Sequence, residues 1–132
     1  MKLQRSFVMA AVLGLALPLA YADNSTNYVS GGIGEEGMAS MHSMASEYPL
    51  HIIFSEGSDG AYVADVPVGI LDRHHKTVVD VADAGPLLYV RLPKGKYMVT
   101  AEHNGTKQSR SVTLDGKHSK SLIMHWAGTP QE

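Results

Sequence analysis

Residues 92–99 of this 132-residue chain read Leu-Pro-Lys-Gly-Lys-Tyr-Met-Val. Pro93 cannot donate to a β-ladder and ends the apolar run before it, while Gly95 allows the backbone to turn. Tyr97 and Val99 are two residues apart, so their side chains lie on the same face of a strand. The stretch therefore predicts a turn followed by a β-strand with one buried face.

Apolar and polar residues alternate along the chain on both sides of this stretch. Turn signals separate the alternating runs at intervals of roughly 8 to 12 residues, which is typical of an antiparallel sandwich. Asn104-Gly105 is the strongest of these signals, because a type I′ hairpin turn needs positive φ at both central residues. The residues from Ala82 to Pro86 are expected to form a loop. Seven strands are expected, over residues 50–54, 66–70, 77–81, 88–92, 97–101, 112–114 and 122–126.

Two further segments accompany this stretch, Asp65-Val66-Pro67-Val68 and Gly85-Pro86. With them, residues 48–126 resemble the carboxypeptidase regulatory-like domains, whose hairpin reads L-P-x-G-x-Y-x-V and whose fold is a transthyretin-like or prealbumin-like β-sandwich. The resemblance implies an all-β fold, a seven-stranded antiparallel sandwich of the Ig-like or prealbumin-like type. It implies no single activity, because this sandwich serves as an accessory, adhesive or binding module. The residues that match the hairpin are Leu92, Pro93, Gly95, Tyr97 and Val99.

The chain departs from this family in two places. After Asp72, where the family has Gly, it reads Arg73-His74-His75-Lys76, which alters the expected turn type. The enzymatic branch of the group, hydroxyisourate hydrolase, ends in Tyr-Arg-Gly-Ser, whereas this chain ends in Thr-Pro-Gln-Glu. The sequence also has no Cys, no G-x-S-x-G elbow and no H-E-x-x-H motif. We therefore expect a protein that is not an enzyme.

The first 22 residues have the parts of a secretory signal peptide. Basic residues precede an uncharged apolar run at 7–19, and Ala20-Tyr21-Ala22 places small residues before a cleavage site between Ala22 and Asp23. The apolar run is shorter than the roughly 20 residues of a membrane-spanning helix. Export without disulfides fits the bacterial periplasm, so we expect a periplasmic protein with no membrane span after signal removal.

The exported chain divides into a leader at 23–47, the carboxypeptidase regulatory-like sandwich at 48–127 and a tail at 128–132. The leader begins with polar residues and a glycine-rich run, which predicts flexibility. Later in the leader Met38, Met41 and Ala45 recur at helical spacing, which predicts one short helix from residue 35 to 47.

The same segment holds soft metal ligands, Met38, Met41, His42 and Met44. Thioether sulfur and imidazole suit monovalent copper, and three of these side chains fall at i, i+3 and i+4 of a helix. The other interpretation is that the methionines are the apolar stripe by which the helix docks on the sandwich. We favour packing, so no cofactor is expected and copper is the alternative.

The remaining histidines occupy the expected turns and strand ends. Strand direction places His74, His75 and His118 at one end of the sandwich and His103 and His125 toward the other. Three imidazoles at one rim are also a possible set of zinc or copper ligands. The interpretation that we favour is that they are solvated turn residues.

The charge balance bears on the choice of partner. The formal net charge is −2, and removal of the two basic residues of the signal peptide leaves nine Lys and Arg against 13 Asp and Glu. Nucleic acid is therefore not an expected partner. We expect a non-enzymatic periplasmic module for protein interaction or ligand binding, whose partner is another envelope protein or a small ligand. It would act through loops at one end or through an unpaired edge strand. The alternative is a periplasmic copper or zinc binding protein.

Overall fold

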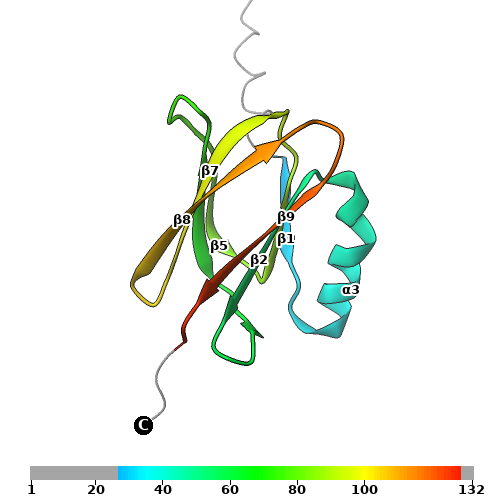
Figure 1. Cartoon of the computed structure of the whole chain (residues 1–132). Helices are drawn as coiled ribbons and strands as arrows, with labels where there is room; N and C mark the ends of the chain where they lie inside the picture. The colour runs from blue at the N-terminus through cyan, green and yellow to red at the C-terminus, as the bar shows by residue number, and fades with distance from the viewer. Residues whose placement is uncertain (1–26, 129–132) are drawn as a thin grey trace, which may run out of the picture.

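Two β-sheets, one α-helix and a short 3₁₀ turn make up the part of the chain that the computed structural model describes, residues 27–128 (Figure 1). The predicted signal peptide, the Ala22–Asp23 cleavage site and residues 129–132 of the predicted tail lie outside these residues. Within them, no helix is both long and apolar enough to cross a membrane.

The first sheet is built around β2 (Leu50–Glu56). On one side β2 pairs antiparallel with β6 (Leu87–Val90), and beyond β6 lies β1 (Tyr28–Gly31). On its other side β2 pairs in parallel with β9 (Lys120–Trp126) along its whole length. The short strand β3 (Ala61–Tyr62) continues the β6 side, where it pairs with the last two residues of β2.

The second sheet has the order β5-β4-β7-β8, and all its neighbours are antiparallel. These strands are β5 (Thr77–Ala84), β4 (Val66–Leu71), β7 (Gly95–His103) and β8 (Thr106–Leu114). The core lies between the two sheets, because the alternating apolar positions of each strand face inward. Its fully buried members include Phe54, Ile70, Leu88, Val99 and Met124.

An all-β architecture of two packed sheets is thus confirmed, but nine strands are present instead of seven among the described residues. The two additional strands are β1, which lies in the predicted leader, and β3. The expected loop at 82–86 is shorter, since β5 continues to Ala84. The sheets are also not wholly antiparallel, because β2 and β9 run in the same direction.

Strand β1 forms because two apolar side chains within a polar stretch both find partners. Tyr28 packs on the core and Val29 on the helix side of the sheet. The Ser30 hydroxyl oxygen accepts a hydrogen bond from the Gly85 N–H at 2.7 Å. A Cβ on Gly85 would lie 2.8 Å from the Gly31 carbonyl oxygen, so only glycine allows this approach. Contacts with β6 and Gly85, which are distant in the sequence, therefore order residues 28–31.

The predicted helix is confirmed as α3 (Gly34–Met44), followed by the 3₁₀ turn η2 (Ala45–Glu47). It covers the outer face of the first sheet beside β1 (Figure 1). Glu35 and Glu36 lie in its first turn, where they complement the helix dipole.

The turn and strand at residues 92–99 have the predicted arrangement. Pro93 precedes β7, and Tyr97 and Val99 are both buried. The Tyr97 hydroxyl donates a 2.8 Å hydrogen bond to the Pro93 carbonyl oxygen, and burial raises the pKa of Tyr97. The Asn104-Gly105 turn has φ values of 52° and 78°, as the type I′ prediction requires.

Candidate functional site

The four methionine and histidine side chains considered as copper ligands fall into different environments. Met41 is 2% exposed and packs beneath α3 against Leu87 and Tyr89. Met44 is half-buried and packs on the same cluster. Only Met38 and His42 line an open surface. Met38 also packs against the Met41 cluster, so the three methionines share one apolar cluster, and only Met38 and His42 meet at the open groove.

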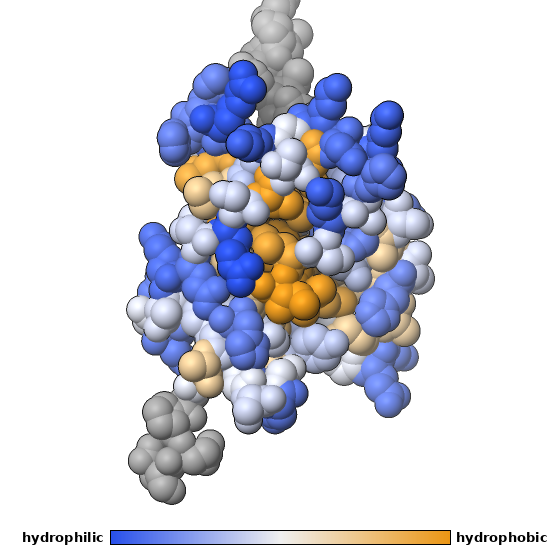
Figure 2. Space-filling model, viewed as in Figure 1, coloured by the Kyte–Doolittle hydropathy of each residue, from blue (hydrophilic) through white to orange (hydrophobic). Residues whose placement is uncertain are grey.

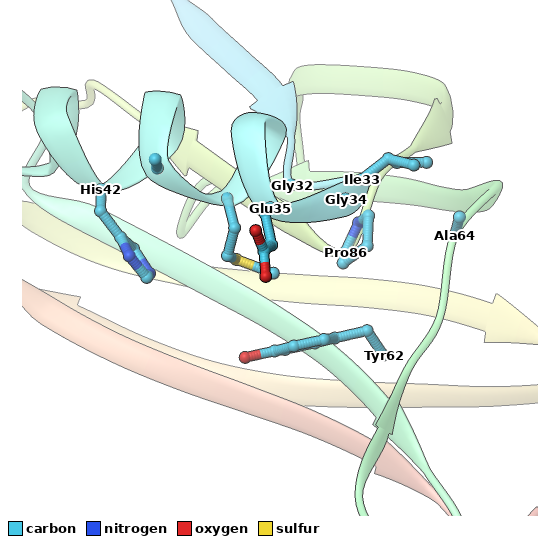
Figure 3. Close-up of a pocket in the computed structure, with 10 residues that line it drawn as sticks. Gly32, Ile33, Gly34, Glu35, His42, Tyr62, Ala64 and Pro86 are labelled. Atoms are coloured by element: carbon cyan, nitrogen blue, oxygen red, sulfur yellow. The ribbon is translucent and has the colours of Figure 1, made fainter.

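Met38 and His42 are one helical turn apart on α3 and line the same pocket as Tyr62. Figure 3 shows His42 on the side of the helix that faces Tyr62. Between the helix and Tyr62 lies a groove of about 680 Å³. Its lining is mostly apolar, and Glu35 is its acidic member. The complete lining is Gly32, Ile33, Gly34, Glu35, Met38, Ala39, His42, Tyr62, Ala64 and Pro86. One thioether and one imidazole supply two soft donors, fewer than the four positions of a closed zinc site.

His74 and His118 form hydrogen bonds with a carboxylate of their own turn. The Asp72 carboxylate accepts hydrogen bonds from the backbone N–H groups of His74 and Lys76 at 2.8 and 3.0 Å, and these bonds contribute to a lowered pKa of Asp72. In the turn between β8 and β9, His118 Nδ1 lies 2.8 Å from Asp115 Oδ2. Hydrogen bonds from the His118 backbone and side chain hold the pKa of Asp115 well below its usual range. Across residues 27–128, no three His, Cys, Asp or Glu side chains gather as a metal site would require.

Two histidine pairs lie at the other end of the sandwich, and the sequence alone does not reveal them. His103 Nε2 is 2.8 Å from Glu56 Oε1, and His125 Nδ1 is 2.9 Å from Ser55 Oγ. Each pair joins residues far apart in the chain, so no local motif marks it. Ser55 and His125 are the residue types of a nucleophile and a base. A serine triad also needs a carboxylate on the second histidine nitrogen, and no such hydrogen bond occurs in the described part of the chain.

Strand β8 is one edge of the second sheet and pairs with β7 alone among the described residues. His103 and Thr106 flank a two-residue turn, so they form a hydrogen-bonded pair. From there, hydrogen-bonded and non-hydrogen-bonded residue pairs alternate along β7 and β8. Four residues of β8 consequently direct their N–H and C=O groups away from β7, toward the free edge. They are Lys107, Ser109, Ser111 and Thr113, and all four are exposed.

Strand β9 is the corresponding edge of the first sheet. The Lys120 N–H donates to the Pro49 carbonyl oxygen at 2.8 Å, and the Gly57 N–H donates to the Trp126 carbonyl oxygen at 2.9 Å. These two bonds show which residues of β9 direct their peptide groups toward β2. The peptide groups of Ser121, Ile123 and His125, which lie between those residues, point away from β2. The Gln108 side chain donates to the His125 carbonyl oxygen, and the other outward peptide groups of β9 have no hydrogen bond within residues 27–128.

The two edges lie on the same side of the molecule. Figure 1 shows β8 and β9 crossing its front side by side, and the Trp126 indole N–H donates to the Thr106 carbonyl oxygen across them at 2.9 Å. Figure 2, from the same viewpoint, shows apolar side chains in the middle of this face framed by polar ones. Ile123 of β9 is 55% exposed. We call this region, β8 and β9 with their free peptide groups, the β8–β9 border.

The border and the α3–Tyr62 groove are thus the two candidate sites. Of the residues in these two sites, the sequence identified Met38 and His42. It also predicted that an unpaired edge strand could bind a partner, but not which strand. The free edge of β8 could not be recognised, because it depends on which strands pair with which. No family model matches the chain, and no curated protein matches it.

Proposed function

We propose that this chain is an exported, non-enzymatic β-sandwich of the carboxypeptidase regulatory-like type, which binds another protein of the bacterial envelope. The binding site is the β8–β9 border, where an extended segment of the partner adds a strand. In such β-augmentation the main chain supplies affinity and alternate side chains supply specificity. The signal-peptide pattern of residues 1–22 supports export.

The observation that supports this proposal best is the contrast between β8 and the other edge strands. Strand β1 has only four residues, and the pairing of β5 with β4 is interrupted by two register shifts. Both features make an edge strand less able to pair with an added strand. Strand β8 keeps an unbroken register with β7 over nine residues. A long regular edge with small hydroxyl residues at three of its four outward positions is suited to receive another strand.

The test is selection of short peptides on the full chain from a random display library. Ser109→Pro removes an outward N–H that no residue of the sheet uses, and Ser109→Ala is the matched control that keeps it. Selected peptides are expected to bind Ser109→Ala like the unchanged protein and to bind Ser109→Pro weakly. N-methylation of alternate peptide residues tests the same hydrogen bonds without altering the protein. If no peptide is enriched, or if both the proline variant and the N-methylated peptides bind fully, the proposal is wrong.

A further inference from the structure

Acidic and basic residues are divided sharply between an N-terminal and a C-terminal part of the described chain. Residues 27–90 contain nine Asp and Glu against two Lys and Arg, whereas residues 91–126 contain two Asp and Glu against seven Lys and Arg. Strands β7, β8 and β9 belong to the basic part, residues 91–126. The protein is acidic overall, yet the border lies in its basic part.

Two of these cations lie on the core faces of the edge strands. Arg110 pairs with Val99 and Lys120 pairs with Leu50, and both partners are fully buried. The side chains of Arg110 and Lys120 lie on the same inward face of the sheets as those of their partners. They are nevertheless exposed, because β8 and β9 are the edge strands of their sheets. Any strand added at the border therefore meets cationic side chains on its core-facing side.

Half-buried apolar side chains accompany the cations on this side. Val112 of β8 and Leu122 of β9 each follow their cation by two residues and pack against the core. On the outer face of β8 the cationic position is Lys107, followed by Ser109, Ser111 and Thr113. The edge of β8 thus presents an ordered series of one apolar and two cationic positions.

We propose that the partner segment at the border is an acidic extended strand that runs antiparallel to β8, with one apolar and two acidic side chains opposite Val112, Arg110 and Lys107. Side chains directly opposite each other in an antiparallel pair have Cβ atoms about 5 Å apart, so opposite charges attract there. Read from its N-terminus, the segment has an apolar residue, an acidic residue two positions later and a second acidic residue three positions after that. This inference rests on the proposed function.

The probe is an end-blocked nonapeptide, Thr-Thr-Val-Thr-Glu-Thr-Thr-Glu-Ser, compared with the same peptide carrying Lys in place of both Glu. Binding to the full chain is followed by amide chemical shifts and by titration. The Glu peptide is expected to bind more tightly than the Lys peptide and to shift the β8 amides. Arg110→Glu is expected to weaken the Glu peptide about fivefold, as expected when an exposed attraction becomes a repulsion, and to favour the Lys peptide instead. Arg73→Glu, in the turn between β4 and β5, is the control and should leave both affinities unchanged.

The outcomes separate this inference from the proposed function. Equal affinities for the two peptides, or no reversal by Arg110→Glu, would overturn the acidic-partner inference. If library peptides still lose binding to Ser109→Pro, the edge remains the site and only the partner chemistry is wrong. A Glu peptide that binds equally well to Ser109→Pro and to the unchanged protein would show attraction without strand addition and would overturn the inference, whereas the proposed function depends on the library peptides. A Glu peptide that fails to bind at millimolar concentration would overturn the inference alone.

Discussion

The side-chain amide of Gln108 donates a 2.6 Å hydrogen bond to the backbone carbonyl oxygen of His125. It connects the two edge strands close to the point where the Trp126 indole meets the Thr106 carbonyl oxygen. Both bonds lie at the hairpin end of β8. The outward peptide groups of Lys107, Ser109, Ser111 and Thr113 have no hydrogen bond within residues 27–128. The contacts with β9 therefore use the Thr106 carbonyl and the Gln108 side chain, and they leave the outward peptide groups of β8 open.

Gln108→Ala removes this fastening. We expect the free energy of unfolding to fall by about 0.5–1.5 kcal/mol, the usual net contribution of one hydrogen bond. Urea unfolding followed by fluorescence of Trp126 measures the change, with Ser109→Ala as the neighbouring control. A loss above about 3 kcal/mol would mean that Gln108 supports more than one bond.

Met41→Ala and Met38→Ala are expected to differ strongly. Met41 is buried between α3 and the sheet, so its truncation should cost about 2–5 kcal/mol of unfolding free energy. Met38 is half-buried at the edge of the same cluster and lines the open groove, so its truncation should cost less, about 1 kcal/mol, because solvent can occupy the space that the side chain leaves. Thermal unfolding of the two variants makes the comparison.

A copper titration of the same variants distinguishes packing from ligation. If Cu(I) raises the melting temperature of the unchanged protein and Met38→Ala abolishes that rise, Met38 is a ligand and the packing interpretation of this residue is wrong.

Local patterns predicted much of this fold, because they depend on residues close together in the sequence. Tyr97 and Val99 alternate on one buried face, Asn104-Gly105 adopts the predicted turn, and the helical spacing of Met38 and Met41 corresponds to α3. The sequence could not predict that β1 is a strand, since residues 28–31 are ordered by β6, nearly 60 residues later. The parallel pairing of β2 with β9 and the free edge of β8 are likewise properties of the topology. The β8–β9 border and the strand β1 could not be predicted for the same reason: both depend on which strands pair, and this is decided by residues distant in the sequence.

Asp115→Asn is expected to lower the melting temperature at neutral pH. Hydrogen bonds from His118 and Lys117 lower the pKa of this carboxyl in the folded protein below its usual value of 3.8. A depressed pKa means that the stabilisation is fully present above pH 4 and is lost as pH falls through the folded pKa. The two proteins should thus differ in melting temperature above pH 4 and converge in strong acid. Asp83→Asn on β5 is the matched exposed control, and an equal effect of both substitutions at all pH values would contradict the assignment.

Gly85→Ala tests how the leader is joined to the sandwich. The added methyl would lie 2.8 Å from the Gly31 carbonyl oxygen, and this neighbour is backbone, which cannot rotate away as a side chain would. Either β1 separates from β6 or the Gly85 N–H loses its 2.7 Å bond to the Ser30 hydroxyl. We expect a loss of about 1–3 kcal/mol in unfolding free energy together with faster amide exchange in residues 28–31. Gly105→Ala is the control, because it strains a turn at positive φ but has nothing within 4 Å of the added carbon. If Gly85→Ala destabilises the protein while the protection of residues 28–31 stays unchanged, β1 is not held by this close contact.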